Sequence, residues 1–153
     1  MAAQAWKIYR EAKKKLGTAA LALSTGTFKM SLYRNSASGT ITSLSTISVK
    51  SSVAGEISAT GGYAAGGKAI AGVIWTTGAS ALQIKWSYQT SGLVFTASGA
   101  ALNNIRYALL YKSASAGGGP VVCYASLSSA AFTISSGNTL TILPASGGVF
   151  TLA

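Results

Sequence analysis

The spacing of apolar residues divides the chain into a short segment with helical periodicity and a longer remainder with strand periodicity. Over residues 4–16 the apolar side chains recur every three or four positions and would share one helix face: Ala5, Ile8, Tyr9, Ala12 and Leu16. Gly17 follows where a helix C-cap is expected. We therefore predict an amphipathic helix over residues 4–16.

After Gly17 the apolar period becomes two, as in half-buried strands. Segments rich in β-branched and aromatic residues predict strands at 28–33, 68–76, 82–88, 93–96, 105–111, 121–126, 131–134, 139–143 and 149–152. The Ser/Thr-rich stretch 41–49 also reads as extended. Gly, Ser and Asn clusters separate these segments, which is typical of a sandwich or barrel. The pattern predicts an all-β chain, with residues 1–17 as a basic helix or arm and residues 18–153 as a single antiparallel β-sandwich domain.

The charge inventory is strongly one-sided. Twelve basic residues face two acids, Glu11 and Glu56, and the chain has neither aspartate nor histidine. The net charge of +10 predicts attraction to an anionic partner, which could be nucleic acid, a membrane face or an acidic protein.

Five of the basic residues lie between positions 7 and 15. One interpretation is a helix that docks on an acidic surface, and the other is a solvated helix packed onto its own sheets. For docking, the candidate partner-binding residues are two anchors and four charge partners: Trp6, Tyr9, Lys7, Arg10, Lys13 and Lys14. The other basic residues are scattered, and Trp75, Trp86 and Tyr107 fall in apolar strand patterns that indicate core or interface packing. Nucleic acid is therefore not the expected partner.

The residue inventory argues against an enzyme. Serine triads need a base, and histidine is absent; paired-carboxylate chemistry needs two acids close together. Cys123, the single cysteine, lies in an apolar run and is expected to be a buried thiol that forms no disulfide and no zinc cluster. We expect no catalytic residue, cofactor, metal or small-molecule substrate.

One segment resembles a phosphate-binding loop. Residues 62–68 fit the pattern G-x-x-x-x-G-K, but Ala69 stands where a magnesium-binding hydroxyl is required. The residues that follow favour a strand, whereas the phosphate site needs a helix N-terminus. We interpret the segment as a glycine-rich loop that enters a strand.

The N-terminus shows no apolar signal-peptide core, and the longest apolar run, Ala69–Trp75, is too short to span a bilayer. The expectation is a soluble protein made in the cytoplasm, with no membrane partner.

A family likeness extends along nearly the whole chain. It rests on these segments: Ala5–Lys13 with Leu16-Gly17, Thr27–Tyr33, Gly62-Tyr63 with Gly66–Lys68 before the strand with Trp75, Arg106–Tyr111, Gly137–Ile142 and Gly148–Leu152. Their order resembles small virion proteins of tailed bacteriophages that decorate or cement the capsid. One departure is the segment with Ala19, Leu21, Leu23 and Ser24, where members of this pattern often carry acids.

The resemblance implies a jelly-roll-like β-sandwich, a homo-oligomer that could be a dimer or a trimer, and a position on the virion surface. It further implies a site that bridges neighbouring subunits of the major capsid protein and so stabilises the assembled capsid. Related small β proteins occur in tails, necks and fibres, so a tail, neck or fibre protein is the alternative. A basic nucleic-acid-binding protein is the second alternative.

Overall fold

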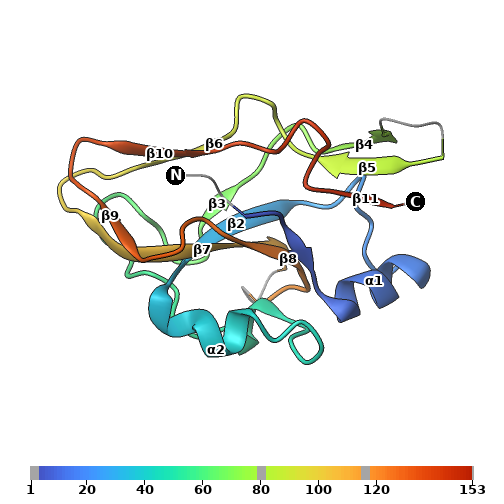
Figure 1. Ribbon diagram of the computed structural model, residues 1–153, viewed down its shortest axis with the longest axis horizontal. Helices are drawn as coiled ribbons and strands as arrows, with labels where there is room; N and C mark the ends of the chain where they lie inside the picture. Colours follow the sequence, from blue (N-terminus) through green and yellow to red (C-terminus); the bar gives the residue numbers. More distant parts are fainter. Residues whose placement is uncertain (1–3, 79–81, 115–117, 153) are drawn as a thin grey trace.

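The computed structural model describes residues 4–78, 82–114 and 118–152, in which antiparallel strands predominate (Figure 1). The main sheet has the order β1-β8-β7-β2-β3, and β9 pairs with β7. Its strands are β1 (Lys7–Ile8), β2 (Phe28–Arg34), β3 (Lys68–Ala69), β7 (Leu102–Lys112), β8 (Val121–Ser126) and β9 (Phe132–Ile134). The prediction of an all-β, antiparallel chain is confirmed.

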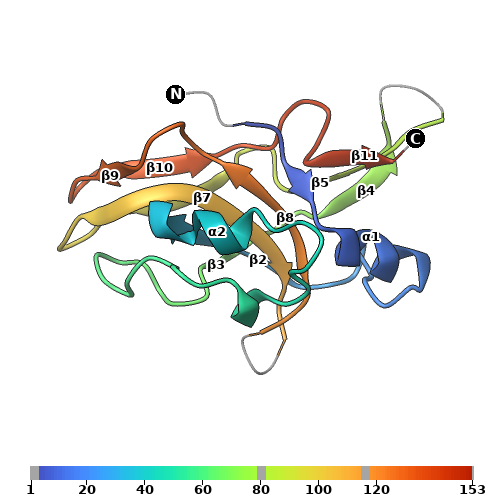
Figure 2. The ribbon, with the colours of Figure 1, turned by 60° about the horizontal axis from the view of Figure 1, so that its bottom comes forward.

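Two smaller sheets complete the β-structure. One is β10-β6 and the other is β11-β5-β4. Their strands are β4 (Ile74–Thr77), β5 (Ile84–Ser87), β6 (Leu93–Thr96), β10 (Thr139–Ile142) and β11 (Phe150–Leu152). In Figure 1 both small sheets lie above the main sheet, whereas the helices lie below it. The view of Figure 2 keeps β4, β5, β11 and α1 together at one end of the molecule.

The main sheet is covered on both faces, which explains its nearly continuous apolar runs. All six residues of β8 are buried, and so are Tyr107–Tyr111 of β7. A strand buried on two faces has no solvent side for polar residues. On the small-sheet side, the Phe28 ring meets the Trp86 ring edge-on at 5.2 Å between centroids. This contact joins β2 to β5.

The helices are short. They are α1 (Arg10–Gly17), α2 (Ser38–Ile41) and two 3-10 turns at Asn35–Ala37 and Lys50–Ser52. None of the helices in the described residues is long and apolar enough to cross a membrane.

The predicted helix over 4–16 is wrong in its first half. Lys7 and Ile8 form β1 and pair with Tyr124 and Cys123 at the edge of the main sheet. The Tyr9 N–H continues this pairing by donating to the Val122 carbonyl at 3.1 Å. Strand β8 would otherwise present an open edge, and the N-terminal segment satisfies its backbone groups. Residues 7–9 therefore belong to the sheet.

Two other predictions need correction. The stretch 41–49 is not a strand: it begins at the end of α2, with Ile41 and Ile47 turned into the core. The predicted strand 68–76 is divided into β3 and β4, and Gly72 between them has a φ of +58°, which favours glycine. The interpretation of residues 62–68 as a loop entering a strand is confirmed, because β3 begins at Lys68.

Candidate interaction surface

The N-terminal candidates occupy three different environments. Lys7 is exposed on β1, Tyr9 is buried, and α1 begins only at Arg10. Arg10, Lys13 and Lys14 are exposed and spaced three and four residues apart, so they share one side of α1. We call these three residues the basic helix face. The structure therefore keeps together only half of the predicted set.

Tyr9 is a core residue, and its predicted role as a surface anchor is wrong for the described chain. Its exposed fraction is 0%, and its hydroxyl donates a 2.6 Å hydrogen bond to the Ile41 carbonyl. The ring lies 5.8 Å from that of Tyr124. Burial, with a smaller effect of Tyr124, raises the pKa of Tyr9 above its ordinary range. Tyr9 thus ties α1 to α2 and the main sheet.

Trp6 lies at a groove between the N-terminal segment and the end of the chain. The side chain is half-buried and packs against the core. The groove has a volume of ≈ 600 Å³, and its opposite wall is formed by Leu143–Ala145 and Gly148–Thr151. Leu143 in that wall is 60% exposed. Trp6 therefore remains accessible to a partner, although it stands apart from the basic helix face.

The sheet β11-β5-β4 exposes apolar side chains that the sequence did not single out as a site. Trp75, Trp86 and Phe150 lie opposite one another across its three strands, so their side chains share one face. Trp86 and Phe150 are buried, but Trp75 is 37% exposed. Ile84 and Leu152 lie two residues away from Trp86 and Phe150 on their strands and therefore on the same face. They are 36% and 38% exposed. We call Trp75, Ile84 and Leu152 the apolar sheet face.

The end of α1 adjoins this face. Leu16, Leu21 and Leu23 line a cavity of ≈ 250 Å³ together with Trp75. Leu16 follows Lys13 by three residues, which is less than one helical turn. The cavity therefore connects the apolar sheet face to the helix that carries the basic helix face. Figure 1 shows α1, β4, β5 and β11 at the same end of the molecule.

Glu56 braces the glycine-rich loop. Its Oε1 accepts 2.6 Å hydrogen bonds from the Tyr63 hydroxyl and the Gly66 N–H, and its Oε2 accepts one of 2.6 Å from Lys50 Nζ. The Tyr63 hydroxyl also accepts the Leu32 N–H at 3.0 Å. Burial raises the pKa of Tyr63, and its hydrogen bond to the Glu56 carboxylate raises it further. Because Lys50 compensates its charge and two donors fill Oε1, Glu56 has a structural role.

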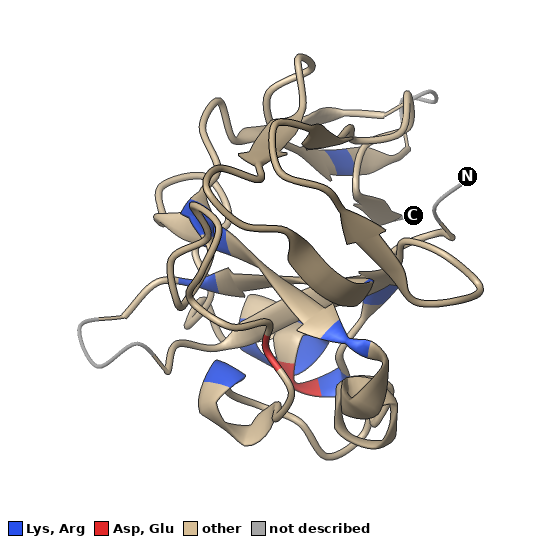
Figure 3. Cartoon of the chain, turned by 90° about the vertical axis from the view of Figure 1, so that its left-hand side faces the viewer, with Lys and Arg blue, Asp and Glu red and all other residues tan. Residues whose placement is uncertain are grey.

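Most cations of the chain lack a carboxylate partner. All twelve basic residues and both acids lie in the described part, which contains two ion pairs. Arg10 lies 3.6 Å from Glu11, and Lys50 lies 2.6 Å from Glu56. The other ten cations find no side-chain acid in the chain. Figure 3 shows the basic positions spread over several strands, from the top of the view to the bottom.

The remaining reactive groups are inaccessible or isolated. The described residues contain no group of three or more His, Cys, Asp and Glu side chains placed to hold a metal ion. Cys123 is fully buried, and burial raises the pKa of its thiol, which keeps it protonated. This matches the buried thiol expected from the sequence.

Comparison of the chain with protein-family models, with curated proteins and with solved structures finds no match in any of the three.

Proposed function

We propose that the chain is a non-enzymatic structural protein of a virion, which binds the assembled capsid of a tailed bacteriophage and stabilises it by bridging major capsid subunits. The proposal includes the jelly-roll-like arrangement implied by the sequence resemblance. It assigns the contact to the apolar sheet face together with the basic helix face.

The observation that carries the proposal is the excess of cations without carboxylate partners, together with an exposed apolar surface beside the basic helix face. Trp75, Ile84 and Leu152 leave apolar area in water that a partner would bury, and burial of such area is favourable by about 25 cal/mol per Å². Lys13 and Lys14 on the adjoining helix attract acidic side chains of the same partner. Surfaces of this composition, with an aromatic centre and a charged rim, are typical of protein interfaces.

The stabilising effect follows from linkage. A protein that binds only the assembled, expanded form of the capsid shell, and not its unexpanded form, lowers the free energy of the expanded form. The effect grows with the number of sites occupied. If copies of the chain associate as a dimer or trimer, each cluster presents several weak contacts on one rigid body, and these reinforce one another. Among the described strands, β4 pairs with β5 alone, and its open edge gives a route for such association.

Co-sedimentation with purified capsids tests the proposal. The protein is mixed with expanded and unexpanded shells of the particle that carries it, and bound protein is measured over a concentration series. We expect saturable binding to expanded shells and none to unexpanded shells. Absence of binding to both would overturn the assignment.

The alternatives have their own readouts. A label on the chain that is imaged only on the tail, neck or fibres of the particle would replace the capsid assignment by a tail, neck or fibre protein. Filter binding to DNA at several salt concentrations tests the nucleic-acid alternative, because phosphate contacts give a steep fall in affinity with salt. The aromatics Trp86, Tyr107 and Tyr111 are buried, which removes them as platforms for base stacking.

A further inference from the structure

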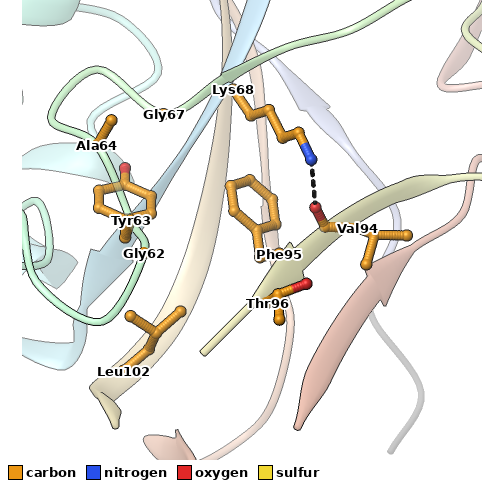
Figure 4. A pocket seen from close by; sticks show the side chains of 9 residues that line it. All are labelled: Gly62, Tyr63, Ala64, Gly67, Lys68, Val94, Phe95, Thr96 and Leu102. Carbon is orange, nitrogen blue, oxygen red and sulfur yellow. Dashed lines mark hydrogen bonds between the residues drawn. The ribbon is translucent and has the colours of Figure 1, made fainter. Parts of the chain in front are cut away.

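A pocket of ≈ 240 Å³ lies beside the glycine-rich loop, between β3 and β6. Figure 4 shows Lys68 reaching to the Val94 carbonyl, with the Phe95 and Tyr63 rings to one side and Leu102 below. The pocket is bounded by backbone hydrogen bonds on either side. Gln89 N–H bonds the Ala71 carbonyl at 3.0 Å, and Ser98 N–H bonds the Gly61 carbonyl at 2.9 Å. It is thus an opening, called the window below, between the glycine-rich loop with β3 on one side and β6 on the other.

The edge of β6 turns backbone donors toward this window. Lys68 Nζ donates to the Val94 carbonyl at 3.1 Å, so the backbone polar groups of Val94 point away from β10. In an antiparallel strand, alternate residues direct both N–H and C=O to the same side. All four residues of β6 are in register with β10. By this alternation the N–H groups of Leu93 and Phe95 are directed to β10, whereas those of Val94 and Thr96 face the window. Neither N–H has a hydrogen-bond partner among the described residues.

The lining residues offer several donors but no negative charge. Lys68 contributes an ammonium, Thr96 adds its hydroxyl, and the nine lining residues contain no acid. Both acids of the chain are engaged elsewhere, Glu11 with Arg10 and Glu56 with Lys50. An ammonium with two strand-edge amides favours an anionic oxygen group, because charge-assisted hydrogen bonds are the stronger ones.

The walls of the pocket are apolar and fixed in place. Tyr63 and Phe95 are each 5% exposed, and their rings lie 6.0 Å apart. The Tyr63 hydroxyl is held by Glu56 and by the Leu32 N–H. The volume is below the roughly 300–1,000 Å³ typical of pockets for small-molecule ligands and cofactors. The pocket suits a short aliphatic stem that ends in an anion.

We propose that this pocket binds the carboxylate of an acidic side chain, glutamate or aspartate, from a partner protein. The carboxylate oxygens accept from Lys68 Nζ and from one of the two strand-edge amides, the Val94 or the Thr96 N–H, and the methylene stem packs on Phe95 and Leu102. This inference rests on the proposed function only in taking the partner to be a protein. Its test uses small probes and no capsid, so the pocket proposal and the proposed capsid-binding function can fail separately.

The test is a titration followed by ¹⁵N–¹H NMR. The probe is a capped Gly-Glu-Gly tripeptide, and the control probe is its Gly-Gln-Gly counterpart. We expect saturable shifts at the Val94 and Thr96 amides with the glutamate peptide and none with the glutamine peptide. Lys68→Gln should weaken the binding at least about tenfold. Lys112→Gln, an equal change of charge at the end of β7, should leave it unchanged.

Three outcomes would overturn the proposal. They are the absence of saturable shifts at Val94 and Thr96, equal binding of the glutamine peptide, and equal weakening by Lys112→Gln. A parallel titration with inorganic phosphate separates the sources of the anion. Weaker binding of phosphate than of the glutamate peptide supports a side-chain carboxylate, whereas tighter binding at the same amides would assign the pocket to a free anion.

Discussion

The carboxylate of Glu56 accepts a 2.6 Å hydrogen bond from the hydroxyl of Tyr63, and this contact ties the glycine-rich loop to the central sheet. The same hydroxyl accepts the Leu32 N–H of β2, 31 residues earlier in the chain, so the Tyr63 side chain connects Glu56 to the main sheet. Lys50 closes the network on the other carboxylate oxygen. Of the two ion pairs among the described residues, the more buried one thus serves a loop that lines the Lys68 pocket.

Replacement of Glu56 by glutamine should therefore destabilise the protein. The side chains of Lys50 and Glu56 are 16% and 17% exposed, and the variant leaves the ammonium without its anion. We expect a loss of about 2 kcal/mol in the free energy of unfolding, measured by urea denaturation. The matched control is Glu11→Gln, because the Arg10–Glu11 pair is 68% and 24% exposed and should contribute under about 0.5 kcal/mol. Equal losses in the two variants would contradict the bracing role.

Gly67 and Gly99 give a second matched pair. Both have φ values in the left-handed region, +72° and +75°. A Cβ at Gly67 would lie 1.9 Å from the Met30 carbonyl oxygen, whereas at Gly99 nothing lies within 4 Å. Gly67→Ala should cost about 3–5 kcal/mol, because backbone must move, and Gly99→Ala about 1 kcal/mol. Thermal unfolding of the two variants checks the difference, and similar melting temperatures would show that the loop does not pack as described.

Two tryptophans on one face of β11-β5-β4 should behave in opposite ways. Trp86 is buried, stacks on Phe150 at 5.5 Å and donates from Nε1 to the Leu23 carbonyl at 3.1 Å. Trp86→Ala should cost about 3–5 kcal/mol of stability. Trp75→Ala should cost about 1 kcal/mol, because the side chain is partly exposed.

The Trp75 variant should instead lose function. Since Trp75 lies at the centre of the proposed contact, co-sedimentation with expanded shells should weaken about tenfold or more. The companion variant Lys13→Gln/Lys14→Gln should weaken the same binding, with a larger effect at low salt. Full binding by both variants would exclude this surface. These substitutions are a cleaner test than truncation of residues 1–16, because truncation also removes β1 and the buried Tyr9 and Ala12.

The protein should lose stability at alkaline pH. Burial raises the pKa of Tyr9, Tyr63, Tyr88 and Cys123 in the folded state. In the unfolded chain these groups ionise near their ordinary values, about 8.5 for cysteine and about 10 for tyrosine. The folded state then holds more protons, so the stability present below about pH 8.5 falls as the pH rises above it. Urea midpoints measured at pH 7 and about pH 10.5 should show this fall, and equal midpoints would contradict it.

The sequence predicts most strands because apolar alternation and glycine turns are local signals. Segments 93–96 and 121–126 coincide with β6 and β8. The misassigned N-terminal helix shows the limit of this reasoning. The spacing of Ile8, Tyr9 and Ala12 suits a helix face, but the open edge of β8 pairs with Lys7 and Ile8. Pairing between residues more than a hundred positions apart does not affect the local spacing of apolar residues, from which the helix was predicted.

The candidate surface was only partly predictable for a related reason. Trp75 and Trp86 both occur in apolar strand runs, and the sequence does not tell them apart. Their exposure depends on which strands of β11-β5-β4 pack on the core and which extend beyond it, and this is a tertiary property. The Glu56 network was equally hidden, because Glu56 lies in a polar stretch beside Gly55 and its partners are Lys50, Tyr63 and Gly66. The basic residues of α1 were visible directly as a charge cluster.

Electron cryomicroscopy of the particle that carries this protein tests the central claim most directly. We expect density for the chain on the outside of the capsid shell, at positions that touch more than one major capsid subunit. The apolar sheet face with Trp75 and the basic helix face should lie against those subunits. Density for the chain on the tail, or on the shell with Trp75 directed toward solvent, would contradict the account.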